Sequence, residues 1–280
     1  MGLEAPARCA ADQVRLVISI ATIALLSPAR AVAVRTGSPP CSMQARGEEP
    51  GKVADPAAEP APPTVGTFRT GYFETRLAPT PQRTKTWVHI CAYLARFIAV
   101  DAAVLELGAG WCDFSNHVRA KRVVAMDLDS RVSKAAAGHV EAVIGDCTDL
   151  SRFADGEFDV VFASNLLEHL PRELAEKLLI EAARVLSHSG RLIIMQPNFR
   201  LNPGGYFDDY THVAIYTDRS LADYLTSLGW TLEIVMPRFL PLTLKSKASG
   251  LTFLVPWYLR SPIKPMAGQM LLVATPEVAH

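Results

Sequence analysis

Short runs of apolar residues recur between residues 104 and 274, and they alternate with stretches in which apolar residues return at helical spacing. The first run, VLEL at 104–107, is mostly apolar, as a strand buried on both faces of a parallel sheet requires. Gly108 and Gly110 follow directly, at the point where the chain must turn into a helix. The pattern therefore predicts a strand, a tight turn and the start of a helix.

Further apolar runs have the length and composition of strands. They lie at 123–126, 141–144, 158–165, 191–196, 231–236 and 270–274. Helical spacing predicts helices at 87–98, 113–119, 173–186 and 220–228. Two glycines mark predicted helix ends: Gly190 as the C-cap after 173–186, and Gly229 after 220–228. The alternation predicts a doubly wound, Rossmann-like α/β sheet, mostly parallel, with helices on both faces and an antiparallel last strand.

The glycine turn has the features of a site for a nucleoside-bearing cofactor. Glycine lets the backbone adopt positive φ and lets a ligand approach the main chain with no Cβ in the way. Asp127 follows Gly108 by nineteen residues and ends the next apolar run, at the spacing typical of an acid that binds ribose hydroxyls. We therefore expect Gly108, Ala109 and Gly110 to cradle the cofactor, and Asp127 and Leu128 to contact it.

Two details favour S-adenosylmethionine over NAD. The chain continues with Trp111, Cys112 and Asp113, so the third glycine of the G-x-G-x-x-G fingerprint is missing. Glu106 stands just before the glycines, where a carboxylate repels a pyrophosphate but attracts the cationic amino-acid end of S-adenosylmethionine. At these residues the chain resembles the class I S-adenosylmethionine-dependent methyltransferases of the type-11 group, whose first motif runs acid-x-Gly-x-Gly-x-Gly. Here Cys112 replaces the last glycine.

The resemblance covers about Tyr72 to Thr275 and implies further cofactor contacts. In that family the Gly-Asp pair after the third strand holds the adenine, which assigns Asp146 and Cys147 to this role. The alternative is that Asp146 only caps a turn. Asn165 ends the apolar run at 158–165 and is expected at the cofactor, because ligands of open α/β sheets bind at the carboxyl ends of the strands.

A Glu-His pair, Glu168 and His169, comes one helical turn after Asn165. Such a pair invites a metal interpretation, but no second ligand pair lies at a suitable spacing, so we predict no metal site. The resembled family has the same pair after this strand, which implies that it braces the helix and the mouth of the site.

The loop at 204–212, GGYFDDYTH, follows the strand at 191–196 and is rich in polar and aromatic side chains. Asp208, Asp209 and His212 are candidates for acceptor contact or general base, since histidine titrates near neutral pH and a neighbouring carboxylate can orient it. We assign the catalytic roles to His212 and Asp209. The alternative is that both only cap and tie down the loop.

Two other segments bear on acceptor binding. The connection at 237–269 is longer than the hairpin of the basic fold and mixes apolar with basic side chains. We interpret it as an acceptor lid, with a dimer surface or peripheral membrane contact through 239–264 as alternatives. In the resembled family the N-terminal segment with the first helix often lids the cofactor, which would bring Tyr72, Arg83 or Trp87 near it. The alternative makes Trp87 a core residue and Arg83 a solvated cap.

Residues 1–65 are rich in alanine and proline, and we predict a disordered or targeting-like extension before a domain at 66–280. The apolar stretch at 14–26 mimics a signal peptide and is too short to span a bilayer. A targeting remnant and a mis-assigned start upstream of Met43 are the alternatives.

The composition of the chain indicates which kinds of partner to expect. The 28 Lys and Arg residues balance the 28 Asp and Glu residues, so no nucleic acid is expected as a partner. The five cysteines are scattered without a Cys-x-x-Cys pair, which argues against both a disulfide framework and a zinc site. Reduced cysteines and a cofactor that is made in the cytosol predict a cytoplasmic protein.

The predicted function is transfer of the methyl group of S-adenosylmethionine to a small molecule or to a glycan- or lipid-linked metabolite. Because the sulfonium is already activated, such enzymes act largely by positioning. A non-catalytic S-adenosylmethionine-binding module and an NAD-dependent oxidoreductase remain alternatives. A nucleic-acid methyltransferase is disfavoured by the neutral charge.

Overall fold

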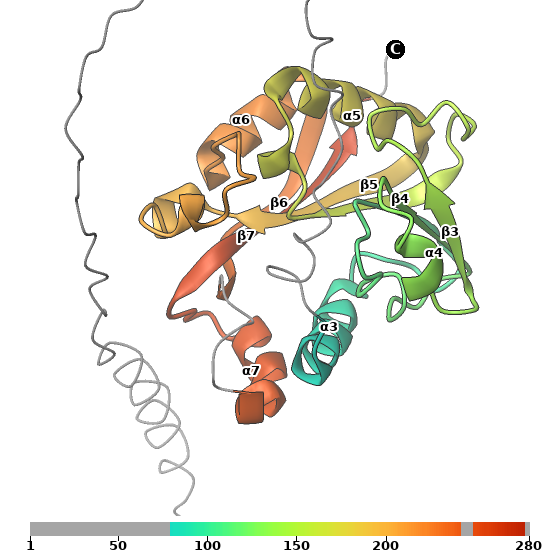
Figure 1. Ribbon diagram of the computed structural model, residues 1–280. Coiled ribbons are helices and arrows are strands. Elements are labelled where there is room, and N and C mark those ends of the chain that lie inside the picture. Colours follow the sequence, from blue (N-terminus) through green and yellow to red (C-terminus); the bar gives the residue numbers. More distant parts are fainter. Residues whose placement is uncertain (1–78, 242–248, 278–280) are drawn as a thin grey trace, which may run out of the picture. The chain divides into compact units, whose positions relative to one another are not determined.

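The computed structural model describes residues 79–241 and 249–277, and these residues form an α/β domain around a seven-stranded sheet. The strand order across the sheet is β3-β2-β1-β4-β5-β7-β6 (Figure 1). The strands are β1 (Ala103–Leu107), β2 (Arg122–Asp127), β3 (Val140–Ile144), β4 (Phe158–Ser164), β5 (Leu186–Pro197), β6 (Trp230–Pro241) and β7 (Ala267–Pro276).

The strand directions confirm the predicted fold class. Strands β1 to β5 pair in parallel, whereas β7 lies antiparallel between β5 and β6. From β1 the chain winds outward to β3, and β4 then starts the other half on the opposite side of β1. The carboxyl ends of β1 and β4 therefore meet where the winding reverses, which is where ligands of such sheets bind.

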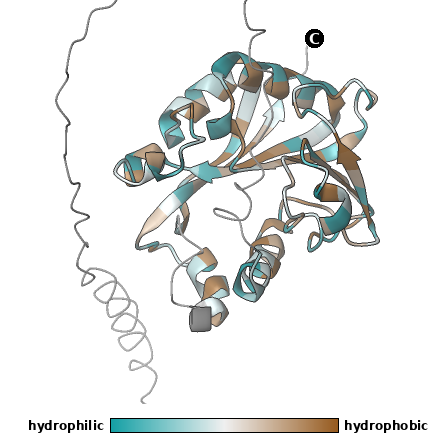
Figure 2. Ribbon diagram, viewed as in Figure 1, coloured by the Kyte–Doolittle hydropathy of each residue, from teal (hydrophilic) through white to brown (hydrophobic). Residues whose placement is uncertain are grey.

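Helices cover both faces of the sheet (Figure 1). On one face lie α5 (Arg172–Val185) and α6 (Asp218–Ser227), whereas α3 (Pro81–Leu94) and α7 (Val255–Arg260) lie on the other. The short helix α4 (Val132–Ala135) follows β2. Brown hydrophobic stripes alternate with teal hydrophilic ones along the helices in Figure 2, as expected for helices with one face on a core.

Each central strand contributes to two apolar cores, because successive side chains of a strand point to opposite faces. Leu105 and Leu107 of β1 pack in the core under α5 and α6. Val104 packs in the other core with Trp87 of α3 and Leu259 of α7. Burial on both faces explains why β1 is nearly all apolar.

Local sequence signals set the helix ends. α3 begins after Thr80, whose Oγ1 accepts a backbone N–H three residues on, and Pro81 is its first residue. α6 begins with a capping box between Thr217 and Ser220. Gly229 follows its end with φ of 78°, the conformation for which glycine is favoured there.

The predicted helix at 113–119 is wrong, because the structure has turns over 110–117. The connection from β1 to β2 is short, at residues 108–121. Within it, Cys112 has φ of 55°, which interrupts any helix that would start before Asp113.

The predicted C-cap at Gly190 is also wrong. Helix α5 ends at Val185, and β5 starts at once with Leu186 in extended backbone. Leu186 pairs with Phe158 and Arg191 with Val160, so the residues around Gly190 bulge from the ladder.

The described part of the 237–269 connection contributes to the core. Phe239, Leu240 and Leu259 are buried in the core that contains α3. The segment also includes η4 (Ser249–Leu254), a 3₁₀ helix, while residues 242–248 lie outside the described part.

The predictions for residues 1–65, for the stretch at 14–26 and for Tyr72 also fall outside the described residues and stay predictions. Within 79–241 and 249–277, no helix combines the length and hydropathy that crossing a bilayer requires.

Candidate functional site

The turn after β1 is fixed to the end of β2. Gly108 and Gly110 have φ of 68° and 52°, which other residues rarely adopt. The N–H of Ala109 donates to the carbonyl of Met126 at 3.0 Å, and the N–H of Gly110 donates to Oδ2 of Asp127 at 2.8 Å. The motif glycines and the acid predicted from their spacing are therefore in direct contact.

Gly108 also faces the segment after β4. A Cβ on Gly108 would lie 2.9 Å from Cδ1 of Leu166, closer than real Cβ contacts. Leu166 directly precedes η1 (Leu167–His169), a 3₁₀ helix, so the turn after β1 and the turn after β4 pack on each other.

Cys112 stands at the last glycine position of the motif and adopts the backbone of a glycine, with φ of 55°. Its side chain is buried, and Sγ contacts the carbonyl of Val132 at 3.8 Å. Burial raises the pKa of this thiol to about 12, so it stays protonated at neutral pH. The motif turn is therefore kept without its third glycine.

Glu106 lies below the turn and is 4% exposed. Its Oε2 accepts the backbone N–H of Ser115 at 3.0 Å and also the Ser115 hydroxyl. Burial raises the pKa of Glu106 to about 8, against the opposing effect of these two hydrogen bonds. A cation placed beside this carboxyl would favour its charged form.

Asp127 is held by two backbone donors at the carboxyl end of β2. Oδ2 accepts from Gly110 and Oδ1 from the N–H of Asp129, each at 2.8 Å. Burial raises the pKa of Asp127, partly offset by these two bonds. Each carboxylate oxygen retains a lone pair for a further donor such as a hydroxyl. The next residue, Leu128, is 41% exposed.

The ends of β3 and β4 carry the other predicted cofactor residues. Asp146 is exposed and its Oδ1 accepts from the N–H of Thr148 at 2.8 Å, the turn-capping contact of the alternative interpretation, while Cys147 is buried. Asn165 has φ of 49°, and its Oδ1 accepts from Nε2 of Gln269 at 3.0 Å.

These residues share one edge of the sheet, because β1 is paired in parallel with β2 and β4, and β2 with β3. The donor set suits S-adenosylmethionine: Glu106 offers a carboxyl to an ammonium group, Asp127 offers oxygens to ribose hydroxyls, and Asp146 can accept from an adenine amine. A set of three acids does not suit a pyrophosphate. The residues present therefore fit the cofactor that the motif implies.

Helix α3 meets the glycine turn through an ion pair. Nε of Arg83 lies 2.5 Å from Oδ2 of Asp113. Trp87 is 4% exposed and packs edge-on against Phe162 of β4, at 6.3 Å between ring centroids. Trp87 is therefore a core residue, and Arg83 is paired rather than a solvated cap.

The loop before α6 is bonded to η1. The N–H groups of Val213 and Ala214 both donate to the carbonyl of Glu168, at 2.8 and 3.1 Å. The Tyr206 hydroxyl donates to the carbonyl of Ala214 at 2.7 Å. These bonds bring His212 to Glu168, although the two are far apart in the sequence.

The loop also forms a polar chain with His169. The Thr211 hydroxyl donates to Oδ1 of Asp209 at 2.6 Å and lies 2.9 Å from Nδ1 of His169. The His212 ring lies between two aromatic rings, with centroids 4.9 Å from His169 and 4.7 Å from Tyr206. The Asp209 carboxylate is thus linked through Thr211 to His169, a connection that the sequence did not indicate.

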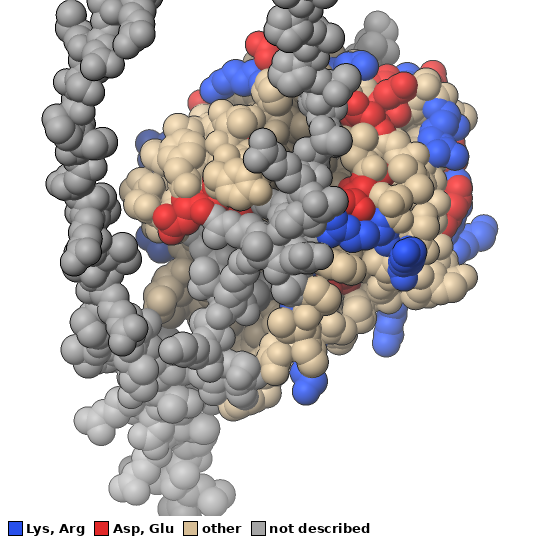
Figure 3. Space-filling view, viewed as in Figure 1, with Lys and Arg blue, Asp and Glu red and all other residues tan. Residues whose placement is uncertain are grey.

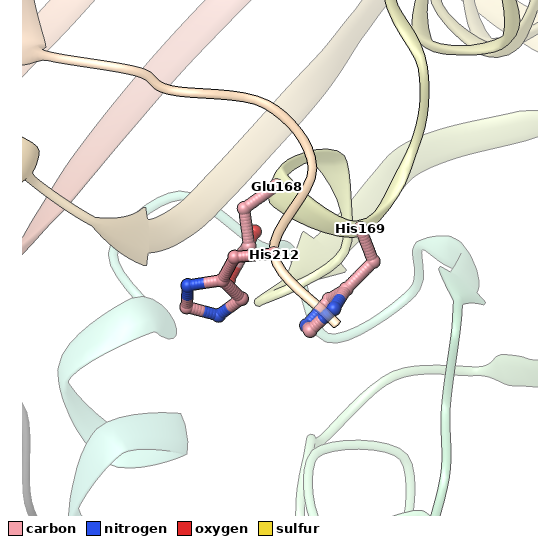
Figure 4. Close-up of side chains that lie close together, drawn as sticks. All are labelled: Glu168, His169 and His212. Carbon is pink, nitrogen blue, oxygen red and sulfur yellow. The ribbon is translucent and has the colours of Figure 1, made fainter. Parts of the chain in front are cut away.

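Glu168, His169 and His212 gather at this place, from η1 and from the loop (Figure 4). Each offers one ligand atom, and these atoms lie within 4.8 Å of one another. The prediction of no metal assumed that the Glu-His pair had no further ligand nearby, and the structure places His212 beside it.

The side chain of Glu168 is fully buried, and neither carboxyl oxygen has a hydrogen-bond partner among the described residues. Burial, with the charge of Asp209, raises the pKa of Glu168 to about 8. Burial, with repulsion from His212, lowers the pKa of His169 to about 4.

Two more buried polar groups in this half of the sheet were missed by the sequence analysis. Gln196, near the end of β5, is fully buried and its amide atoms have no partner among the described residues; the Tyr216 hydroxyl is likewise buried without one. The signal for Gln196 was present, since a polar residue ends the apolar run at 191–196.

Comparison with known proteins gives the type of domain. Residues 105–194 match the family model of a methyltransferase domain, Methyltransf_11. The comparison with curated proteins gave no match.

Solved structures share the fold at low identity. The N1-methyltransferase for 1,6-didemethyltoxoflavin from Burkholderia thailandensis, solved with that compound and S-adenosylhomocysteine, is 18% identical, with a TM-score of 0.51 over 74% of this chain and 84% of its own. A chain of the Haloferax volcanii complex between the Trm112 methyltransferase activator and a methyltransferase is 15% identical, with a TM-score of 0.53 over 70% and 91%. The PH0226 protein from Pyrococcus horikoshii is 19% identical, with a TM-score of 0.52 over 74% and 96%.

Proposed function

We propose that this chain is a class I S-adenosylmethionine-dependent methyltransferase whose acceptor is a small molecule or a glycan- or lipid-linked metabolite. The observation that carries the proposal is the shared edge of the sheet. There the glycine turn is bonded to Asp127, and a polar and aromatic loop closes the same edge beyond β4 and β5.

We assign the cofactor contacts by the chemistry of each group. Glu106 faces the amino-acid end, the backbone of Gly108, Ala109 and Gly110 lines the approach, and Asp127 accepts from the ribose hydroxyls. Four further residues at the ends of the strands complete the assignment: Leu128 and Cys147 beside the adenine, Asp146 to its amine, and Asn165 toward the methyl-bearing end. The support is the common edge and the fit of the donor set.

On the acceptor side we propose His212 and Asp209 as the catalytic pair. When bound, S-adenosylmethionine supplies an activated methyl group. The chain then needs to hold the acceptor atom in line and to accept its proton. His212 is partly buried in the loop before α6. Asp209 accepts a hydrogen bond from the Thr211 hydroxyl, which contacts His169, so Asp209 helps to orient both residues.

A metabolite acceptor is favoured over nucleic acid by the charge distribution. Positive and negative side chains are interspersed on the face shown in Figure 3, in keeping with the zero net charge of the chain. A nucleic-acid surface would concentrate Lys and Arg.

A lipid-linked acceptor would be approached through the 239–264 segment. Phe253, Trp257 and Ile263 are 63%, 70% and 69% exposed, and Arg260 is exposed on the same helix as Trp257. Apolar and basic side chains together suit peripheral contact with lipid headgroups. The acceptor lid and the cytoplasmic location remain predictions.

The test is to incubate the full chain with cell extract and methyl-labelled S-adenosylmethionine, and to separate small molecules, glycolipids, protein and RNA. Label in small molecules or glycolipids supports the proposal, and label in RNA or protein contradicts it. With the cofactor below saturation, Asp127→Ala should lower the label, whereas Asp223→Ala, at an exposed aspartate on α6, should not. Cofactor binding without label in any fraction would support the non-catalytic alternative.

A further inference from the structure

We propose that Glu168, His169 and His212 form a binding site for one divalent transition-metal ion of the Zn²⁺ type. The two imidazoles and one carboxylate are the ligand set of zinc sites that keep a position open for water or substrate. The inference deepens the proposed function, because the open position would accept an oxygen of the acceptor.

The spacing of the three side chains suits a metal ion. The three ligand atoms lie within 4.8 Å of one another. Ligand atoms at about 2.1 Å from a tetrahedral zinc are about 3.4 Å from one another. Side-chain rotations that move the ligand atoms by about an ångström would bring them to this spacing. Figure 4 shows the two imidazole rings side by side, with the Glu168 carboxyl next to His212.

Glu168 has an unsatisfied side chain at this place. Its carboxyl is fully buried and has no hydrogen-bond partner among the described residues, which is costly for any polar group. The backbone carbonyl of Glu168 accepts hydrogen bonds from the N–H groups of Val213 and Ala214. The backbone is therefore fixed in place, while the carboxyl group can still accept a ligand. A cation would satisfy both oxygens.

The ring of His169 is held by neighbouring groups, as the rings of metal ligands usually are. Histidine ligands usually bond their second ring nitrogen to a carbonyl, hydroxyl or carboxylate, which fixes the ring. Nδ1 of His169 lies 2.9 Å from the Thr211 hydroxyl and 3.3 Å from the Thr211 carbonyl, and that hydroxyl is in turn bonded to Asp209. These contacts fix the ring of His169 at the cluster, and Nε2 is the nitrogen that would bind the metal.

The ligand types select among metals. Imidazole favours Zn²⁺, Fe²⁺, Ni²⁺ and Cu²⁺ over Mg²⁺ and Ca²⁺, which prefer oxygen ligands alone. In the metal-free chain His212 keeps the base role proposed above, and with metal bound it would contribute to removal of the acceptor proton as a ligand. An acceptor hydroxyl bound to the metal would lose its proton at lower pH, so the metal would assist the same deprotonation that a base assists.

The test uses the untagged full chain, stripped with a chelator and dialysed against Zn²⁺ or Co²⁺, with metal content measured by mass spectrometry. We expect about one equivalent, and for Co²⁺ the visible absorption of a four- or five-coordinate site. Glu168→Gln and His212→Asn should each lower the Zn²⁺ affinity by more than about a hundred-fold, since loss of an outer partner alone costs about ten- to a hundred-fold. Thr211→Val should show that smaller loss.

The matched control is His188→Gln, since His188 is exposed on β5, away from this cluster. It should bind metal as the parent does. Parent protein with no retained metal, or cluster variants that retain it fully, would overturn the inference. Circular dichroism of each variant excludes misfolding, and if Glu168→Gln fails to fold, His212→Asn decides. Cofactor affinity, measured on the same samples, reports separately on the proposed function.

Discussion

The two halves of the candidate site differ in how their buried carboxyl groups are satisfied. In the cofactor half, the carboxylates of Glu106 and Asp127 each accept two hydrogen bonds from nearby residues. In the acceptor half, the side chains of Glu168, Gln196 and Tyr216 are buried and have no partner among the described residues.

This difference indicates that the cofactor half is preformed by the backbone, whereas the acceptor half has open hydrogen-bonding capacity. Preformed donors and acceptors bind without reorganisation. Unpaired buried groups cost stability and are typical of places where a ligand, an ion or water completes the structure. Substitutions in one half should therefore leave the property of the other half nearly unchanged.

The largest effect is expected from His212→Ala. The change should lower single-turnover methyl transfer by about 10²–10⁴-fold, the range for loss of general acid–base catalysis, and leave cofactor affinity nearly intact. Transfer is measured by rapid quench once an acceptor is found, and affinity by calorimetry. His188→Ala is the matched control. Transfer at the parent rate, or a loss of cofactor affinity, would place His212 outside the acceptor half.

Asp127→Ala should have the opposite profile. It removes a charged acceptor for the ribose hydroxyls, and such hydrogen bonds are worth about 1.5–3 kcal/mol, or roughly ten- to a hundred-fold in affinity. Calorimetry with S-adenosylhomocysteine measures this loss, with Asp223→Ala as the control. Unchanged affinity would show that Asp127 only fixes the turn through Gly110.

The cofactor half should also respond to pH through Glu106. Its pKa is raised to about 8, so below that pH the free protein carries a neutral carboxyl. A ligand ammonium favours the carboxylate, so cofactor affinity should rise with pH by up to about tenfold per unit until pH 8. In Glu106→Gln this slope should vanish. The same slope in parent and variant would assign the titration to another group.

The smallest effect concerns stability. Gln196→Met removes a buried amide that has no partner among the described residues and replaces it with a side chain of similar shape. The free energy of unfolding should therefore rise by about 1 kcal/mol. Gln269→Met is the matched control, because Gln269 donates to Asn165 at 3.0 Å. The control should lose about 1 kcal/mol. Urea unfolding measures both, and a destabilised Gln196→Met would indicate that this amide has a partner such as water.

The fold was largely predictable, because strands buried on both faces give apolar runs that stand out in the sequence. The errors occurred in connections. The segment at 113–119 has helical composition, but the short connection and the positive φ of Cys112 leave only turns. Gly190 resembled a helix C-cap, yet pairing of Leu186 with β4 extends the strand past it.

The site was predictable where it is contiguous. Gly108, Gly110 and Asp127 belong to one strand–turn–strand unit, so their spacing already implied contact. The meeting of Glu168 with His212 depends on loop residues that donate to the Glu168 carbonyl, and no spacing rule describes that. Both residues were noticed separately, and only the tertiary structure joins them.

The packing of Leu166 on Gly108 has a consequence for the order of events at the site. A Cβ on the glycine would lie 2.9 Å from Cδ1 of the leucine, so the leucine side chain packs closely on the glycine turn. A ligand that shifts the glycine turn toward Leu166 would therefore displace the side chain of the residue that precedes η1. Such coupling is reciprocal: by whatever factor the cofactor changes acceptor or metal affinity, the acceptor or the metal changes cofactor affinity by the same factor.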